Sequence, residues 1–343
     1  MMHVVQQLDE ATWRSFVDGH PDGNIFHTPE MFQVFARAAG HRPELWAALD
    51  DGGRVLALLA PVHVTLLRGL LRRLARRSLV YGGALCDDSP AGREAMALLL
   101  RSYAAHVGGR SLFTEVRNLR EPGRLRPLFG GCGYTYEEHL NYLVDLDRPS
   151  DEIFGAIGPR TRKHIRKGLR DQHVVVRALG ERADLAEWYR LLRQTYHSIR
   201  VPLADRSLFE AAFDLLRPRG MALFLMATVR DVPVACSLEL CYRDTLYGWY
   251  GGSDRAYSKY MPNELLTWHI LEWGASHGYK VYDFGGAGRQ GEAYGVRDFK
   301  AKFGGELVCF GRYTYIHAPN LLRLSRWGYA LYQRAPGVAR LAQ

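Results

Sequence analysis

MALFLMATVRDVPVACSLELCY, residues 221–242, carries the clearest strand pattern of the chain. Two mostly apolar runs flank an Arg-Asp pair, which is the pattern of a β-hairpin with a tight turn. TLYGWYGG follows as a third strand, a helix begins at Pro262 and ends at Gly278, and KVYDFGG is a strand again. A helix that connects two strands of one sheet makes them parallel, so the order predicts a mixed sheet with a helical crossover.

The first half of the chain repeats this order. LWAALDDGGRVLALLAPVHV, residues 45–64, is strand, Asp-Gly turn and strand; a helix begins at Pro90 and ends before two glycines, and SLFTEVRN alternates like a strand. The two copies are separated by about half the chain, which indicates domains rather than a short-period array. We therefore expect an α/β (α+β) fold of two similar domains, residues 1–149 and 150–343, each a mixed sheet flanked by helices.

Composition narrows the class of protein. The net charge of +9 favours an anionic partner, which is nucleic acid, an acidic membrane surface or a phosphorylated substrate. The five cysteines are scattered and form no C-x-x-C pair, as expected for reduced thiols in a cytosolic protein. The sequence shows no signal-peptide pattern and no run of 18 apolar residues. The histidines have no metal-binding spacing, so we expect no metal.

DFGGAGRQGEAYGVRDFKAKFGG, residues 283–305, contains two misleading motifs. DFG lacks the H-R-D and V-A-I-K partners of kinases, and the G-x-G-x-x-G pattern lies near the end of the chain rather than in a first βαβ unit. What remains is a glycine-rich strand end followed by a short basic helix. Because ligands gather at the carboxyl ends of strands, Phe299 and Lys300 are candidate site residues. The alternative is that Phe299 and Phe303 anchor the core while the lysines face water.

LLRGLLRRLARR, residues 66–77, is a basic amphipathic stretch. Arg68, Arg72 and Arg76 recur at a spacing of four, away from the leucines, and we expect them to contact an acidic membrane surface. The alternative is a hairpin extension whose arginines face water. The C-terminal tail is also amphipathic and basic, and it docks either on the protein or on lipid.

PRTRKHIRKGLR, residues 159–170, is a second basic stretch. Arg160 and Lys163 lie on one stripe of the expected helix, which makes them candidate contacts to an RNA backbone. The alternative is a solvated helix face.

YGWYGGSDRAYSKYMPNELLTWHILEWGASHGYKVYDFGGAG and YGVRDFKAKFGGE resemble the Fem family, the aminoacyltransferases that build peptidoglycan cross-bridges, and their tandem acetyltransferase-like (GNAT) relatives. IFHTPEMFQVFARAAGHRPELWAALDDGGRVLALLAPV is similar to the start of the family, and YLVDLDRPSDEIFGAIGPRTRKHIRKGLRDQHVVV to its domain junction. The resemblance covers nearly the whole chain. It implies two tandem GNAT-like domains.

The resemblance also implies a reaction: transfer of an amino acid from aminoacyl-tRNA to an amine on the stem peptide of a peptidoglycan precursor, lipid II or UDP-linked, without a cofactor. The oxyanion formed in this step needs a positive or hydrogen-bonding neighbour. The family pattern places Lys300 against the terminal tRNA phosphate or the oxyanion, and Phe299 against the terminal adenosine. It places Arg206 and Tyr250 against the precursor.

The first domain departs from the family. FAR (35–37) and EVRN (115–118) stand where bridge-forming members have a lysine and an Asp-Pro turn, so the precursor is left open. One alternative is an acyl-CoA-dependent N-acyltransferase, although GGSDRAYSKYMPNELL keeps only the first glycines of a CoA loop. Another is a non-catalytic membrane- or RNA-binding relative. We expect a monomer in the cytoplasm, peripheral at the inner face of the plasma membrane where it touches lipid.

Overall fold

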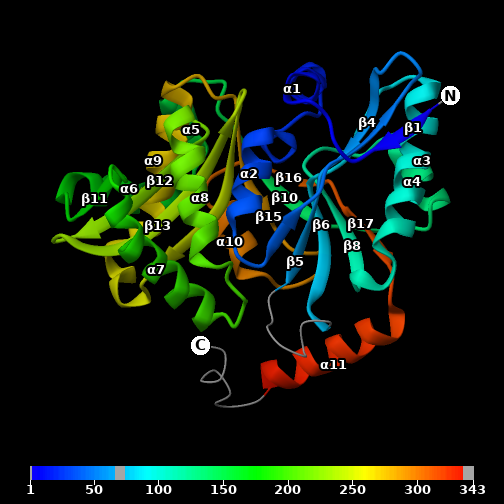
Figure 1. Cartoon of the computed structure of the whole chain (residues 1–343). Coiled ribbons are helices and arrows are strands. Elements are labelled where there is room, and N and C mark those ends of the chain that lie inside the picture. Colours follow the sequence, from blue (N-terminus) through cyan, green and yellow to red (C-terminus); the bar gives the residue numbers. More distant parts are fainter. Residues whose placement is uncertain (1, 66–73, 335–343) are drawn as a thin grey trace. The chain divides into compact units, whose positions relative to one another are not determined.

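The computed structural model describes residues 2–65 and 74–334. These residues form two compact units: unit 1 contains the described residues up to Glu137 and from Arg312 onward, and unit 2 contains Glu138–Gly311. Each unit holds a mixed sheet flanked by helices, so the predicted fold class is confirmed (Figure 1).

The boundary between the units differs from the one expected at residue 149. Strand β10 (Leu140–Asp145) lies between β15 and β16 in the sheet of unit 2. Strand β17 (Arg312–Ile316) returns to unit 1 and lies between β8 and β9. Unit 1 is therefore built from two separate segments of the chain, because its sheet takes in a strand from beyond residue 311.

Unit 2 is organised around a seven-stranded sheet in the order β11-β12-β13-β14-β15-β10-β16. The predicted hairpin is formed by β12 and β13, and its turn residues Arg230 and Asp231 both have positive φ, as a type I′ turn requires. Strands β14 and β15 pair in parallel, and the other neighbours pair antiparallel. The strand bounds are β11 (Val174–Ala178), β12 (Ala222–Val229), β13 (Val232–Tyr242), β14 (Thr245–Ser253), β15 (Val281–Gly286) and β16 (Glu306–Cys309).

Helices cover both faces of this sheet. The crossover helix α9 (Pro262–Ser276) connects β14 to β15 and packs with α5 (Ser150–Ala156) and α6 (Pro159–Asp171). Helices α7 (Leu185–Ser198) and α8 (Arg206–Leu215) lie on the other face, where Cys236 of β13 contacts the backbone of α7. The short helix α10 (Gly295–Ala301) follows β15 and brings Lys300 back to the end of that strand.

Unit 1 repeats the pattern with two sheets, in the orders β2-β5-β6-β8-β17-β9 and β1-β3-β4-β7. Strands β6 and β8 pair in parallel, with α3 (Pro90–Val107) as the crossover helix between them. The remaining helices are α1 (Glu10–Gly19), α2 (Pro29–Arg37), α4 (Leu125–Gly131) and α11 (Pro319–Arg334). The strand bounds are β1 (His3–Val5), β2 (His41–Pro43), β3 (Trp46–Leu49), β4 (Val55–Leu59), β5 (Pro61–Thr65), β6 (Arg76–Gly82), β7 (Leu85–Cys86), β8 (Phe113–Asn118) and β9 (Thr135–Glu137).

Candidate functional site

Strand β15 ends in glycines whose neighbouring carbonyl oxygens hold the ammonium group of Lys300. Its Nζ donates to the carbonyl oxygens of Phe284 (2.7 Å), Gly285 (3.1 Å) and Gly286 (2.8 Å). Gly285 has a φ of 72°, and a Cβ at this position would lie 3.2 Å from the carbonyl oxygen of Gly248 in β14. Lys300 therefore holds the end of β15, and Gly285 lets that end approach its parallel neighbour β14 closely.

A buried carboxylate lies at the same strand end. Asp283 accepts hydrogen bonds from the backbone N–H of Gly285 (2.7 Å) and from Nδ2 of Asn141, which is 3.2 Å from both carboxylate oxygens. Burial raises the pKa of Asp283 to about 6, although these hydrogen bonds and the charge of Lys300 oppose the rise. Burial also lowers the pKa of Lys300 to about 8, opposed by the charge of Asp283.

This arrangement defines what Lys300 can do. An ammonium group has three donors, and all three are directed at carbonyl oxygens of β15. The residue is only 7% exposed. The side chain therefore stabilises the glycine-rich strand end directly. A ligand bound at this strand end would interact with Lys300 through its positive charge.

A second buried acid lies across β14. The hydroxyl of Tyr282 donates to Oε2 of Glu239 over 3.1 Å, and burial raises the pKa of Glu239 to about 7. The contact passes Gly248, where a Cβ would lie 2.8 Å from the Tyr282 hydroxyl. The register of β13 on β14 shifts between Leu238 and Glu239, which is a bulge beside the acid.

Sequence reasoning did not identify Asn141, Glu239 or Tyr282 as members of this group. One usable signal was Glu239 itself, an acid within the apolar run SLEL of an expected strand, since a buried acid is rare unless it has a partner. The link between Asn141 and Asp283 had no local signal, because the two residues are 142 positions apart.

Phe299 packs next to the core of unit 2. Its ring centroid is 5.2 Å from that of Phe303, and Nζ of Lys302 lies 5.1 Å from the centre of the same ring. The ring is half-buried. This packing agrees with the alternative in which Phe299 and Phe303 anchor the core.

Tyr250 and Arg206 have a common neighbourhood on helix α8. Tyr250 is half-buried and packs edge-on against Phe209 at 4.8 Å and near Tyr196 at 5.9 Å. Arg206 is the first residue of α8 and is exposed, with Nε 2.9 Å from Oε1 of Glu210. Tyr250 therefore contacts α7 and α8, and Arg206 belongs to α8. Lys300 instead contacts the end of β15.

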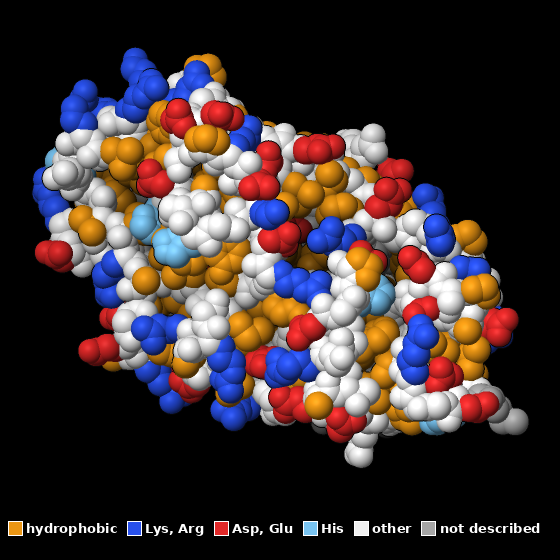
Figure 2. Space-filling view, turned by 90° about the horizontal axis from the view of Figure 1, so that it is seen from above, with side chains coloured by type: hydrophobic (Ala, Val, Ile, Leu, Met, Phe, Trp, Pro, Cys, Tyr) orange, Lys and Arg blue, Asp and Glu red, His pale blue; other side chains and the backbone are white. Residues whose placement is uncertain are grey.

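Helix α6 presents its basic residues to solvent. Arg160 and Lys163 are exposed, while Thr161 and Ile165 face the core. The backbone N–H of Gly158 donates to the carbonyl oxygen of Lys302 over 2.8 Å, which joins the start of α6 to the end of α10. Figure 2 shows Lys and Arg side chains interspersed with Asp and Glu over the drawn face rather than gathered in one continuous patch.

The predicted membrane contact falls largely outside the described residues. Arg68 and Arg72 lie there, and Arg76 is half-buried at the start of β6. Among residues 2–65 and 74–334, no helix is both long and apolar enough to cross a bilayer. Within the same ranges, no three or more His, Cys, Asp or Glu side chains come together in a way that could hold a metal ion.

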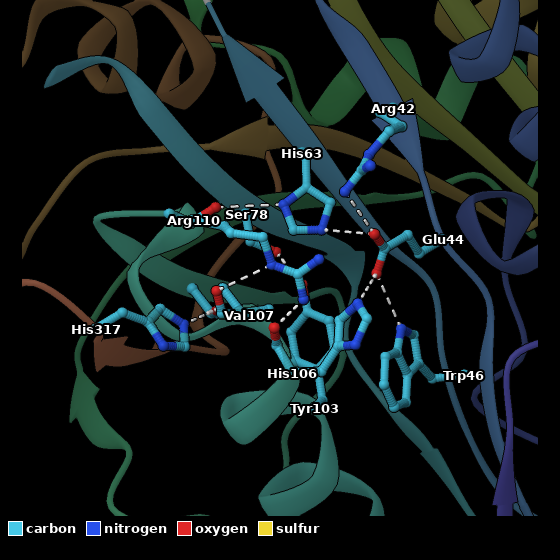
Figure 3. Close-up of polar contacts among 12 residues, drawn as sticks. Arg42, Glu44, Trp46, His63, Ser78, Tyr103, His106, Val107, Arg110 and His317 are labelled. Atoms are coloured by element: carbon cyan, nitrogen blue, oxygen red, sulfur yellow. Dashed lines mark hydrogen bonds and ion pairs between the residues drawn. The ribbon is translucent and has the colours of Figure 1, made fainter. Parts of the chain in front are cut away.

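Unit 1 contains a separate cluster of polar side chains, drawn in Figure 3. Glu44 accepts from Arg42 (2.8 Å) and Trp46 (3.1 Å), and Nε2 of His63 lies 3.2 Å from its carboxylate. Burial opposes ionisation of Glu44, but His63, Trp46 and Arg42 outweigh it and hold the pKa at about 2. Nδ1 of His63 is 3.3 Å from the hydroxyl of Ser111. Ser111 is 2% exposed, so this Ser-His-Glu arrangement offers no accessible nucleophile.

Two mixed units, each with a parallel strand pair joined by a crossover helix, are the architecture of tandem GNAT-like proteins. Residues 159–301 match the family model described as "Acetyltransferase (GNAT) domain". The chain is therefore a tandem GNAT-like protein by fold, with a GNAT domain in unit 2.

Solved structures share this fold. The crystal structure of FemX superposes with a TM-score of 0.69 at 16% identity, over 94% of this chain and 99% of FemX. A tandem GNAT protein from the clavulanic acid biosynthesis pathway gives 0.59 at 13% identity, over 92% and 99%. L-PGS from Bacillus licheniformis gives 0.57 at 14% identity, over 94% and 97%.

One curated relative is similar in sequence. Lipid II:glycine glycyltransferase of Staphylococcus haemolyticus is 32% identical over 83 residues, which is 23% of this chain and 20% of that protein. The matched region thus spans only about a fifth of that relative's length. Together with FemX and the GNAT match, it confirms the resemblance to the Fem family that the sequence motifs indicated.

Proposed function

We propose that this protein is a Fem-type aminoacyltransferase that adds an amino acid to the stem peptide of a peptidoglycan precursor, lipid II or UDP-linked, with aminoacyl-tRNA as donor and without a metal or other cofactor. The observation that carries the proposal is the buried Lys300 ammonium at the carboxyl end of β15, within electrostatic range of the buried Asp283, in a chain that resembles the Fem family over most of its length. Ligands of open α/β sheets bind at such strand ends.

The reaction joins an amine to an ester carbonyl. The amine nitrogen bonds to the carbonyl carbon, the tetrahedral oxyanion collapses, and the bond to the tRNA 3′ oxygen breaks; the proton lost by the amine ends on that oxygen. Positive potential at the site stabilises the oxyanion. We assign Lys300 a positioning role, because its N–H groups hold the strand end and its charge remains close by.

The other predicted residues have proposed roles around this centre. Phe299 is assigned to the terminal adenosine of the donor through the part of its ring that stays accessible. Arg160 and Lys163, both exposed on α6, are assigned to the tRNA backbone. Arg206, the first residue of α8, and Tyr250, which packs against Phe209 of the same helix, are assigned to the precursor.

An acyl-CoA-dependent N-acyltransferase is the second candidate, favoured by the GNAT match of residues 159–301. The connection from β14 to α9 argues against it. A 3₁₀ helix, Arg255–Tyr260, separates the strand from α9, and α9 begins with Pro262, which has no N–H. A pyrophosphate site at a helix start depends on such free N–H groups.

Donor consumption tests the proposal. The protein is incubated with a peptidoglycan precursor and either a mixed pool of charged tRNAs or acetyl-CoA, and the loss of donor and the mass of the acceptor are followed. We expect loss of aminoacyl-tRNA and an acceptor heavier by one aminoacyl group, with slower transfer by Lys300→Met than by the control Lys302→Met. Consumption of acetyl-CoA alone contradicts the proposal, and consumption of neither donor supports a non-catalytic binding protein.

A further inference from the structure

Helix α11 contacts unit 1 through one side. Leu322 is 5% exposed, and the hydroxyl of Ser325 donates to the carbonyl oxygen of Leu74 over 2.6 Å. Leu74 lies two residues before the start of β6, and Figure 1 shows α11 beneath the ends of β5 and β6. The position of this helix along unit 1 is thus fixed by Leu322 and Ser325.

The opposite side of α11 exposes large apolar side chains. Trp327 is 65% exposed, Leu324 49% and Leu321 40%. Leu324 and Trp327 are three positions apart, so they are neighbours on one face of the helix. Ile316, at the end of the preceding strand, is 47% exposed. A water-facing helix normally places its apolar stripe inward, so this outward stripe calls for a partner.

The charges around this stripe all have one sign. Arg323 and Arg326 of α11 are exposed, and the sequence of the helix contains no acidic residue. Arg76 and Arg77 begin β6, next to the residue that Ser325 contacts. Arginines that flank leucines and a tryptophan match an anionic surface with an apolar interior, since tryptophan prefers the boundary between water and hydrocarbon.

We propose that α11 docks on the surface of an anionic phospholipid bilayer, with Leu321, Leu324 and Trp327 inserted among the acyl chains and the arginines at the headgroups. The helix has 16 residues and is not apolar enough to cross the bilayer, so it lies in the plane of the interface. RNA fits this face less well, because its exposed stripe of Leu321, Leu324 and Trp327 is apolar rather than cationic. A second copy of the helix would bring arginines against arginines.

Vesicle co-sedimentation of the full-length protein tests the inference, with no precursor or tRNA present. We expect binding to phosphatidylcholine vesicles that contain phosphatidylglycerol, and roughly tenfold weaker binding to phosphatidylcholine alone. Leu324→Ser with Trp327→Ser should lower binding to the anionic vesicles by roughly tenfold or more. Leu98→Ser is the matched control, because Leu98 is an apolar residue of α3 in the same unit with 36% exposure.

Three results would overturn the inference. The first is unchanged vesicle binding by the Leu324/Trp327 double variant. The second is equal binding to both vesicle types. The third is a change in oligomeric state of the double variant by light scattering, which assigns the apolar face to a second copy. Circular dichroism checks that the variants fold, as expected for exposed positions.

Discussion

The ammonium of Lys300 donates to three carbonyl oxygens and is close enough to the buried carboxylate of Asp283 to interact with it electrostatically. Lys300→Met leaves these groups without their partner, and we expect a loss of about 3 kcal/mol in the free energy of unfolding. Lys302→Met is the control in the same segment, since its side chain is 44% exposed and its Nζ lies 3.5 Å from Oε1 of Glu264, and it should cost less than about 1 kcal/mol. Urea unfolding at neutral pH measures both; equal losses would contradict the assignment.

Glu239 makes the stability of the protein depend on pH. Its folded pKa of about 7 lies above the ordinary value of 4.5, so the folded state keeps a proton that the unfolded state releases between these values. The contribution of Glu239 to stability therefore falls as the pH rises from about 4.5 to about 7 and then levels, by roughly 3 kcal/mol.

Glu239→Gln keeps an acceptor for Tyr282 and removes this titration. Between pH 5 and pH 8, the midpoint of urea unfolding should therefore fall less for the variant than for the wild type. Asp283, whose folded pKa of about 6 is also raised, leaves a smaller fall in the same direction. Parallel pH profiles of the two proteins would show that Glu239 is not the responsible group.

Single residues also mark the limit of inference from sequence. Lys300 could be singled out because a lysine follows a glycine-rich strand end, and this local pattern places its helix correctly. Its surroundings could not, because the carbonyl groups of β15 carry no side-chain signal and Asn141 comes from a distant strand. The sequence therefore predicted a cation at this strand end, but not the three carbonyl oxygens that hold it.

Among the secondary-structure elements, strand β14 has a glycine, Gly248, at the point where the hydrogen bond between Tyr282 and Glu239 crosses it. Gly248→Ala places a methyl group 2.8 Å from the Tyr282 hydroxyl and 3.4 Å from Oε2 of Glu239. We expect this buried hydrogen bond to break, at a cost of about 1–3 kcal/mol. Gly251→Ala is the control in the same strand, where the nearest atom is 3.7 Å away. Thermal unfolding compares the two, and a Gly248→Ala protein as stable as the control would refute the constraint.

Strand β17 belongs to unit 1 through long-range pairing. Tyr313 is opposite Val116 of β8 and Tyr136 of β9, is 1% exposed, and stacks on Phe129 at 4.3 Å. Tyr313→Ala should cost about 3–5 kcal/mol and lower the unfolding midpoint of unit 1. Ile316→Ala in the same strand removes an exposed side chain and should cost little. Hydrogen exchange in β8 and β9 identifies the unit affected; faster exchange only in unit 2 would contradict the pairing.

Strand β17 shows which elements can be predicted from sequence patterns and which cannot. The hairpins, the third strand and both crossover helices were predicted because their partners are neighbours in the chain. The assignments of β10 and β17 could not be predicted, because an alternating strand pattern fits either sheet and the pairing joins residues nearly 200 positions apart, as Arg312 and Arg117 do.

At the scale of the whole molecule, the net charge of +9 alone does not distinguish RNA from membrane, and the positions of the basic residues make the distinction testable. Arg160→Glu with Lys163→Glu and Arg323→Glu with Arg326→Glu change the net charge equally, on α6 and on α11. We expect the α6 pair to weaken tRNA binding and to reduce the slope of log K against log salt by roughly one to two units. The α11 pair should instead weaken binding to anionic vesicles and leave tRNA binding nearly unchanged. Filter binding over a salt series measures the effect on tRNA, and vesicle co-sedimentation measures the effect on lipid. If both variants weakened both interactions alike, only the overall charge would matter. The assignment of separate surfaces would then be wrong.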